Sequence, residues 1–419
     1  MGIDHRRTRL FTLIMALAVI AAACSSSSTD EADDVDADAT EAATAADADA
    51  ADDGDTDTDT DTDEGEAENA GEGDETALSG FDAVTDTVES FVDSAGLEGA
   101  GLIVVHEDDG VIYEEYFGAF TEDRISMIAS TSKMISAGVL LHLQDDGLLD
   151  VDAPVEEVVD WVGENPEITT AQLLSNSSGL VGLGPDLFYS PYLCQWAPAD
   201  NLQRCGESVF TTSADDDDQI PPDSEFRYGG AQWQVAGAVA ETVSGQSWAD
   251  LIDEVYNEPC GLDSLGYISL GAIEFPESGY PIAFGGDPAN ATPSDNPNIE
   301  GGAYITVGDY GELLLMHLRG GTCGDTQVLS QEALDTMYAD RVAAVYDGDA
   351  TAADIGYGMG WWIDRDSGQI TDPGAWGAIA WLDLDDRYGA YLIVEDEGAT
   401  GQALKSQIDG FVHQGAVGA

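Results

Sequence analysis

Residues 128–144 read IASTSKMISAGVLLHLQ, a short polar segment that runs directly into an apolar one. From Met134 to Gln144 nearly every side chain is apolar, which predicts a helix that is buried on most of its surface and stops at Gly147. Ser130 and Lys133 stand at the entrance to this helix. Residues three apart on a helix lie on one face, with about 5–6 Å between their Cβ atoms. The spacing therefore predicts that the lysine amine reaches the serine hydroxyl.

A lysine at this place has the chemistry of a general base. An ammonium cannot accept a proton, so Lys133 has to be neutral when it acts, and burial at a helix N-terminus lowers its pKa. The neutral amine then activates Ser130 for attack on a carbonyl. The chain contains only two lysines, Lys133 and Lys405. In so lysine-poor a chain, a lysine on an apolar helix favours this role over snorkelling to solvent.

Both ends of the remaining chain predict β-strands, and the middle predicts helices and loops. The two pairs of β-rich runs each flank a turn signal, at residues 108–110 and 385–387. This order predicts an α/β (α+β) fold with one sheet built from both chain ends and an inserted helical subdomain. The predicted strands are 102–106, 111–117, 378–384 and 388–394, and the predicted helices are 134–144, 231–242, 331–339 after the capping residue Ser330, and 402–412.

The first 23 residues predict an export signal. A basic start, His5 to Arg9, precedes an apolar run from Leu10 to Ala23 that is short for a membrane span. Three small residues then lead to Cys24, an arrangement that resembles a bacterial lipobox. We therefore expect Cys24 to carry a lipid that anchors the protein to the outside of the cell membrane. Ordinary cleavage and secretion is the alternative.

Residues 24–79 predict a tether, and residues 80–419 predict the folded domain. The tether carries 22 acidic and no basic residues, so it cannot bury enough apolar surface to fold and is expected to be disordered. The domain after it has a net charge of −51. A domain this acidic is not expected to bind nucleic acid or anionic lipid through its surface. Contact with the cell wall stays open to it.

Four further cysteines fall in the domain. An even number in an exported chain favours disulfides, and three connectivities can be drawn. We prefer Cys194 with Cys205, because that pair closes a short loop rich in turn residues, which leaves Cys260 with Cys323. No CxxC or HExxH spacing is present, so no metal site is expected. Nothing in the sequence requires an organic cofactor.

Five other motifs follow the Ser130–Lys133 segment in a fixed order. They are LLSNSSGL at 173–180, FRYGG at 226–230, GGA at 301–303, GYGMGW at 356–361 and DPGAWG at 372–377. With IASTSK at 128–133, they resemble the landmarks of the β-lactamase-related serine hydrolases, the family of class C β-lactamases, DD-peptidases and related esterases. The resemblance runs from about Phe81 to the C-terminus. It implies an antiparallel sheet flanked by helices, with a helical subdomain.

The resemblance also implies a role for several residues. Ser130 would be the nucleophile, and Lys133 and Tyr228 would share the proton transfers. The backbone N–H groups of Ser130 and Ala375 would form the oxyanion hole. Tyr228 needs a cationic neighbour to favour its phenolate. Lys133 is the expected one, although Arg227 is adjacent in the sequence.

Two residues depart from the family pattern, and with Gly374 they are the candidates for substrate binding. Gly230 stands where the family usually has Asn, so an amide that would hold an acyl-amide substrate is missing. Asp372 stands where the family has Lys or His. An aspartate there would repel a substrate carboxylate. Alternatively, Asp372 is a plain turn residue that points away from the site.

These observations favour an exported serine hydrolase that acts through an acyl-enzyme on Ser130, with an ester or small amide as substrate. A β-lactamase or DD-carboxypeptidase is the first alternative, although the substrates of both carry a carboxylate. A catalytically silent cell-wall-binding module of the same fold is the second. A Ser-His-Asp triad is disfavoured, because none of the five histidines falls in a landmark and no G-x-S-x-G surrounds Ser130.

Overall fold

The computed structural model describes residues 80–183, 189–213, 218–273, 280, 294–342 and 354–418. The predicted signal peptide, Cys24 and the tether lie outside the described residues. The first described element, helix α2 (Gly80–Ala95), begins where the tether is predicted to end. Among the described helices, none combines the length and the apolar character that crossing a bilayer would need.

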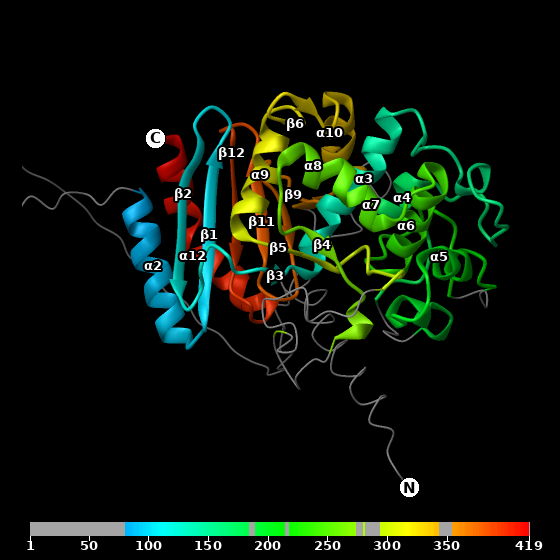
Figure 1. The fold of residues 1–419 in the computed structure, drawn as a ribbon, viewed down its shortest axis with the longest axis horizontal. Coiled ribbons are helices and arrows are strands. Elements are labelled where there is room, and N and C mark those ends of the chain that lie inside the picture. The colour runs from blue at the N-terminus through cyan, green and yellow to red at the C-terminus, as the bar shows by residue number, and fades with distance from the viewer. Residues whose placement is uncertain are drawn as a thin grey trace, which may run out of the picture. The chain divides into compact units, whose positions relative to one another are not determined.

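A seven-stranded antiparallel sheet forms the centre of the domain, in the order β2-β1-β12-β11-β10-β9-β8 (Figure 1). Strand β1 near the start pairs with β12 near the end, from Gly101 opposite Ile393 to His106 opposite Tyr388. The prediction of one sheet built from both chain ends is therefore confirmed. Its strands are β1 (Gly99–His106), β2 (Gly110–Gly118), β8 (Ile355–Tyr357), β9 (Trp362–Asp364), β10 (Ile370–Pro373), β11 (Ile379–Asp383) and β12 (Tyr388–Ile393).

The alternation of side chains along β1 divides the core into two layers. Successive residues of a strand point to opposite faces of the sheet. Leu102 and Val104 pack with residues of α2 and of the C-terminal helix α12 (Gly398–Val417), which together cover one face (Figure 1). Ile103 and Val105 join the larger core on the other face.

The other face carries the helices that lead to Ser130. Helix α9 (Val307–Leu318) packs directly on β1 and β12. Helix α3 (Lys133–Asp145) is the predicted buried helix, and it contacts α10 (Gln331–Tyr338) and the helical subdomain. From Lys133 to Leu143 every residue of α3 except His142 is buried, and Leu140 and Leu141 are fully buried. Helix α3 is therefore a buried central helix between the seven-stranded sheet and the helical subdomain.

The helical subdomain lies between β2 and β8 in the sequence, as predicted. Its helix α6 (Ala231–Ser244) contacts α3, α4 and α5. Ser330 caps α10 by accepting a hydrogen bond from the Ala333 backbone N–H, also as predicted. The remaining elements are β3 (Ser126–Met127), α4 (Thr170–Leu174), α5 (Leu202–Phe210), α7 (Trp248–Ile252), α8 (Glu258–Cys260), β4 (Gly266–Tyr267), β5 (Ala303–Ile305), β6 (Thr322–Cys323), β7 (Thr326–Gln327), a π-helical turn (Asp253–Asn257) and short 3-10 turns at Ala129–Ser132, Val155–Glu157, Ser190–Trp196 and Leu270–Ala272.

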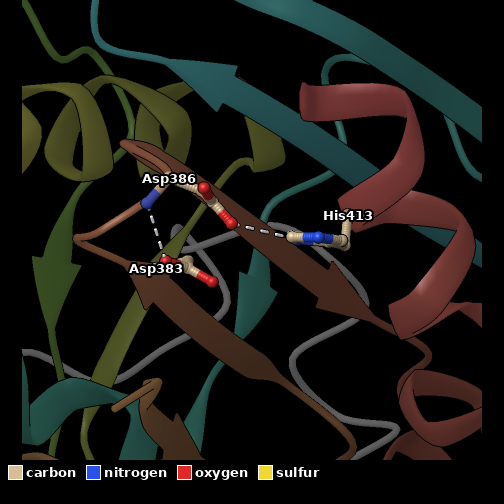
Figure 2. Close-up of side chains that lie close together, drawn as sticks. All are labelled: Asp383, Asp386 and His413. Atoms are coloured by element: carbon tan, nitrogen blue, oxygen red, sulfur yellow. Dashed lines mark hydrogen bonds and ion pairs between the residues drawn. The ribbon is translucent and has the colours of Figure 1, made fainter. Parts of the chain in front are cut away.

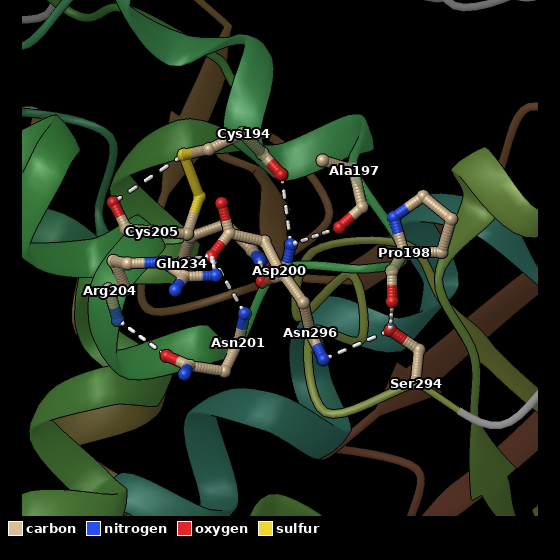
Figure 3. A network of polar contacts seen from close by, with 10 residues as sticks. All are labelled: Cys194, Ala197, Pro198, Asp200, Asn201, Arg204, Cys205, Gln234, Ser294 and Asn296. Carbon is tan, nitrogen blue, oxygen red and sulfur yellow. Dashed lines mark hydrogen bonds and ion pairs between the residues drawn. A yellow bond between two sulfur atoms is a disulfide. The ribbon is translucent and has the colours of Figure 1, made fainter.

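The four domain cysteines form two disulfides with the preferred connectivity, Cys194–Cys205 and Cys260–Cys323. The first ties the turn Ser190–Trp196 to α5. Asn296 adds a second tie, because its side-chain amide donates to the carbonyl oxygens of Cys194 (2.9 Å) and Ala197 (3.1 Å) (Figure 3). The same side chain accepts from Gln234 of α6 at 3.0 Å. Together these contacts fix the segment that carries Trp196.

The N-terminus of α3 is satisfied by a residue from the sheet. The first amides of a helix have no partner within the helix, and an acidic acceptor there is favoured by the helix dipole. Oδ2 of Asp372, at the end of β10, accepts from the Met134 backbone N–H at 3.1 Å. The Asp372 side chain is 1% exposed. A carboxylate of the sheet thus holds the start of the helix that presents Ser130 and Lys133.

Replacing Asp372 by alanine should lower the free energy of unfolding by about 1–3 kcal/mol, because the buried Met134 amide loses its acceptor. Asp372→Asn keeps an oxygen for that amide and should cost less. Asp385→Ala, an exposed aspartate in the turn after β11, is the control and should stay within about 0.5 kcal/mol of the parent. Urea unfolding monitored by tryptophan fluorescence measures all three. Equal stability of the Asp372→Ala and Asp385→Ala variants would contradict the capping role.

Candidate active site

The turn that presents Ser130 is unusually constrained. Ala129 has a φ of +49°, in the left-handed region that residues with a Cβ seldom adopt. The turn is held by Ser132, whose hydroxyl donates to the Ala129 carbonyl (2.5 Å) and accepts from the Ala303 N–H of β5 (3.1 Å). The chain therefore leaves β3, makes one tight turn and enters α3 with Ser130 at a fixed place.

Lys133 lies beside Ser130, as the spacing predicts. Its Nζ donates to Ser130 Oγ at 3.1 Å and to the Glu300 carbonyl oxygen at 2.9 Å. The lysine side chain is 1% exposed. Within the described residues no carboxylate comes within 4.0 Å of this amine to form a salt bridge. The amine is thus enclosed, but it is hydrogen-bonded to neutral oxygens.

The electrostatics of this enclosure favour a reactive amine. Burial lowers the pKa of Lys133 to about 8, against the opposing effect of Glu300 and Asp372. In its neutral form the amine can keep donating to the Glu300 carbonyl while its lone pair accepts the Ser130 O–H. A buried lysine tuned toward neutral pH in contact with a hydroxyl is the arrangement that general-base activation of a serine requires.

Tyr228 completes the group around the amine. Lys133 Nζ lies 4.7 Å from the centroid of the Tyr228 ring. Arg227 turns elsewhere, because its guanidinium donates to Glu225 (3.2 Å) and to the Asp218 carbonyl (2.8 Å). Lys133 is therefore the cation that faces Tyr228.

The motif at 173–180 holds the tyrosine segment in place. Asn176 has a φ of +57°, and its carbonyl accepts from the Arg227 backbone N–H at 2.8 Å. Its side-chain oxygen accepts from Gln232 of α6 at 2.6 Å, and Gln232 also donates to the Arg227 carbonyl at 2.8 Å. These bonds grip the chain on the N-terminal side of Tyr228. The motif thus acts as a scaffold.

The two predicted oxyanion-hole residues lie in segments that pack together. A Cβ added to Gly374 would lie 2.1 Å from the Ile128 carbonyl oxygen and 2.7 Å from Thr131 Oγ1. Only glycine allows the loop after β10 to approach the Ser130 turn so closely. Ala375 is buried in one cluster with Ala129 and Trp376. The loop that carries the Ala375 amide therefore lies against the turn that carries Ser130.

Gly230, where a family asparagine is missing, has its space filled by another residue. A Cβ at Gly230 would lie 2.6 Å from Glu300 Oε1 and 2.8 Å from Gln195 Oε1. An asparagine there would collide with both side chains. Sequence reasoning did not identify Glu300, although it immediately precedes the motif at 301–303. That adjacency was the available signal.

Asp372 and Gly374 are placed differently from the other candidates. Neither is among the residues that line the pocket at Ser130, whereas Gly230 is. Asp372 faces the start of α3 from within β10, so it is neither a pocket wall nor a turn residue. Burial raises its pKa, and Lys133 opposes that rise. Its effect on the site is an electrostatic one exerted through Lys133.

The pocket itself is lined mainly by apolar and aromatic surface. Lys133 supplies its amine and Glu300 its carboxyl group, and Asp372, at the β10 position where the family usually has a cation, is not among its lining residues. Its described lining residues are Ala129, Ser130, Lys133, Leu183, Trp196, Tyr228, Gly229, Gly230, Leu270, Glu300, Gly301 and Trp376.

A second group of potential ligands lies elsewhere in the fold. Asp383, Asp386 and His413 approach one another at the turn after β11 and on α12 (Figure 2). Asp383 caps the turn by accepting from the Asp386 N–H at 2.9 Å, and Asp386 pairs with His413 at 3.5 Å. Asp386 and His413 are 40% and 47% exposed. These contacts account for the three side chains as a turn cap and a surface ion pair.

The described histidines at the core are also structural. His317 is buried, its Nδ1 lies 2.6 Å from the Tyr338 hydroxyl, and burial lowers its pKa to about 3. His142 Nδ1 lies 2.7 Å from the Val328 carbonyl oxygen. Neither residue lines the pocket at Ser130.

Comparison with known proteins agrees with this geometry. The β-lactamase family model matches residues 84–408. Penicillin-binding protein 4 of Amycolatopsis lactamdurans is 27% identical over 280 residues, which cover 63% of this chain and 70% of that protein. Esterase EstB of Burkholderia gladioli is 27% identical over 194 residues, which cover 42% of this chain and 46% of the esterase.

Solved structures show the same fold. A putative β-lactamase from Bacteroides dorei DSM 17855 superposes with a TM-score of 0.62 at 25% identity, over 79% of this chain and 98% of that one. EstCE1, a hydrolase with promiscuous acyltransferase activity, superposes with a TM-score of 0.63 at 17% identity, over 80% and 98% of the two chains. The family match spans most of the chain and includes every residue placed around Ser130. The chain therefore belongs to the β-lactamase family of serine hydrolases, among relatives that include a penicillin-binding protein and an esterase.

Proposed function

We propose that this protein is an exported serine hydrolase that cleaves esters or small amides through an acyl-enzyme on Ser130. The observation that carries the proposal is the enclosed amine of Lys133, 3.1 Å from the Ser130 hydroxyl, with a pKa that burial lowers to about 8. A lysine with no catalytic task would cost stability when buried in this way. A catalytic role in contact with the constrained Ser130 would explain why this lysine is buried.

In this mechanism the neutral Lys133 amine accepts the Ser130 proton while Oγ bonds to the substrate carbonyl carbon. The carbonyl oxygen takes up the negative charge, and the backbone N–H groups of Ser130 and Ala375 stabilise it. Collapse of this intermediate breaks the bond to the leaving group, which takes a proton from Lys133 with Tyr228 as the relay. Water then attacks the acyl-enzyme, gives its proton to the same pair, and releases the acid and Ser130.

The charges of the pocket favour substrates without a carboxylate. The side chain at the position where the family usually places Lys or His is an aspartate committed to the α3 N-terminus. Glu300 adds a carboxyl group to the pocket wall. A substrate carboxylate would therefore meet like charge with no cation except the lysine that must be neutral. Neutral or cationic esters and small amides fit better than β-lactams or D-Ala-D-Ala peptides.

Two other functions use the same fold. A β-lactamase or DD-carboxypeptidase would need a way to hold a carboxylate other than a cation at position 372 of β10. A silent cell-wall-binding module would need no buried amine at Ser130. The retained group of Ser130, Lys133 and Tyr228 favours turnover over the silent module, and Asp372 in place of a cation disfavours the two carboxylate-binding enzymes.

We further propose that the enzyme acts outside the cell, tethered to the membrane by a lipid on Cys24. The support lies in the sequence, where an apolar signal segment ends in three small residues before that cysteine and an acidic tether follows. The two disulfides of the domain suit an oxidising compartment.

Incubating the full chain with p-nitrophenyl acetate, a chromogenic cephalosporin and a D-Ala-D-Ala peptide tests the substrate class. We expect ester hydrolysis that Ser130→Ala abolishes, and an acyl adduct on Ser130 by mass spectrometry, because the hydroxyl is the attacking group. Ser136→Ala, a buried serine of the same helix, is the control for loss of a helical hydroxyl. Fast cephalosporin turnover would overturn the charge argument. Failure of a labelled fluorophosphonate to mark Ser130 would favour the silent module.

The pH profile tests the base. Only the neutral form of Lys133 can accept a proton, so kcat/KM for a neutral ester should rise with pH, with a midpoint near the lowered pKa of about 8. Lys133→Arg should abolish turnover, because a guanidinium stays protonated. The matched control is Lys405→Arg, the only other lysine in the chain, which should leave the profile unchanged. A profile that is flat from acid to alkaline pH would exclude a lysine base.

A further inference from the structure

Glu300 lines the pocket of Ser130 and has one carboxyl oxygen without a hydrogen-bond partner among the described residues. Its side chain is 6% exposed and lines the pocket. Oε1 accepts from Asn298 Nδ2 at 3.0 Å, whereas Oε2 has no hydrogen-bond partner among the described residues. A buried carboxyl oxygen without a partner is costly, and in a native site it calls for an explanation such as a catalytic role, an ordered water or a bound ligand.

Among the described residues, no cationic side chain forms a salt bridge with this carboxyl group. Lys133 contacts Glu300, but through the backbone carbonyl oxygen at 2.9 Å, and it forms no salt bridge with the carboxylate. In the mechanism proposed above Lys133 is neutral when substrate binds. Burial raises the pKa of Glu300, and Lys133 opposes that rise. A cationic ligand beside the carboxyl group would therefore favour its ionised form.

The surroundings of Glu300 favour a hydrogen-bond donor as its ligand. Gln195 Nε2 donates to the Tyr192 carbonyl at 3.1 Å, which turns Gln195 Oε1 toward Gly230. Ideal Cβ geometry at Gly230 places both Oε1 atoms, of Gln195 and of Glu300, within 2.8 Å of one point. Two acceptor oxygens therefore meet where the family usually presents an amide with donors of its own.

The aromatic lining suits a positive charge. Trp196, Trp376 and Tyr228 all line the pocket that contains the carboxyl group. Aromatic faces stabilise cations through their quadrupole, and the Tyr228 ring already lies 4.7 Å from the Lys133 amine. A cationic ligand would find a carboxylate and aromatic surface within one pocket.

We propose that Glu300 is a specificity residue that binds a protonated amino group on the acyl part of the substrate and so places the neighbouring carbonyl at Ser130. The preferred substrates are then esters or small amides of short amino acids. This inference rests on the proposed hydrolase function and narrows its substrate class. The hydrogen bond runs from the substrate ammonium to Oε2, the oxygen that the protein leaves unpaired.

A matched pair of substrates tests the proposal. Phenyl β-alaninate and phenyl butanoate have acyl chains of the same length, and only the first ends in an ammonium near neutral pH. We expect the full chain to favour the β-alaninate in kcat/KM. Glu300→Gln keeps the shape and the acceptor for Asn298 but removes the charge. It should reduce the ratio of the two kcat/KM values at least about tenfold, as expected for loss of one partner of a buried charge pair.

The ratio separates recognition from catalysis. Any effect of Glu300→Gln on the pKa of Lys133 acts on both substrates, so it cancels in the ratio. Glu332→Gln, an exposed glutamate of α10, makes the same change of net charge and should leave the ratio unaltered. A ratio that Glu300→Gln does not change, or a parent that prefers the butanoate, would overturn the proposal.

Failure of the inference can be distinguished from failure of the proposed function. If the parent hydrolyses phenyl butanoate through Ser130 with a ratio near one, the hydrolase function stands and the role of Glu300 falls. If neither ester is hydrolysed and a fluorophosphonate leaves Ser130 unmarked, both proposals fall together.

Discussion

The site depends on one buried amine. Lys133 is shut away from water at the start of a central helix, and its hydrogens go to the Ser130 hydroxyl and the Glu300 carbonyl. Burial lowers its pKa toward the range in which a lysine can act as a base, and its two hydrogen bonds offset part of the cost of that burial. Three features enclose this amine. They are the turn at Ala129 with its positive φ, the Tyr228 ring and the backbone carbonyl of Glu300.

Two departures from the family pattern turn out to be linked to that enclosure. Gly230 has no side chain because the carboxyl group of Glu300 occupies the space. Asp372 replaces a basic residue and turns to the amide of Met134, where it supports the helix. The usual positive and amide groups are thus absent, and acidic groups surround the lysine from two directions. The site thus keeps the family's serine and lysine, while acidic residues stand near the lysine where the family usually has a cation and an amide.

The sequence predicted the parts that follow from local pattern. Runs of β-rich residues at 102–106 and 388–394, each beside a turn signal, identified two central strands, and the apolar run after Lys133 identified α3. Helix α2 was not predicted, since its residues continue the acidic composition of the tether even though Val84 and Val88 repeat at helical spacing. Strands β8 to β10 are three or four residues long and too short for periodicity.

The sequence could not show which distant residue lies against each of the two departures, Gly230 and Asp372. Gly230 and Glu300 are seventy positions apart, and Asp372 and Met134 lie still further apart. No local pattern joins such pairs, so a missing asparagine and a misplaced aspartate could be seen but not explained. The contact between Ser130 and Lys133 was predictable because the two residues lie within one helical turn.

The pairing of β1 with β12 has a consequence for biogenesis. The second and second-last parts of the domain are neighbours in the sheet, so a ribosome must complete almost the whole polypeptide before β1 gains its inner neighbour. Until then the strand offers an open row of amides and carbonyls to any other chain. A topology that joins its beginning to its end depends on contacts between distant parts of the chain, and such topologies fold slowly.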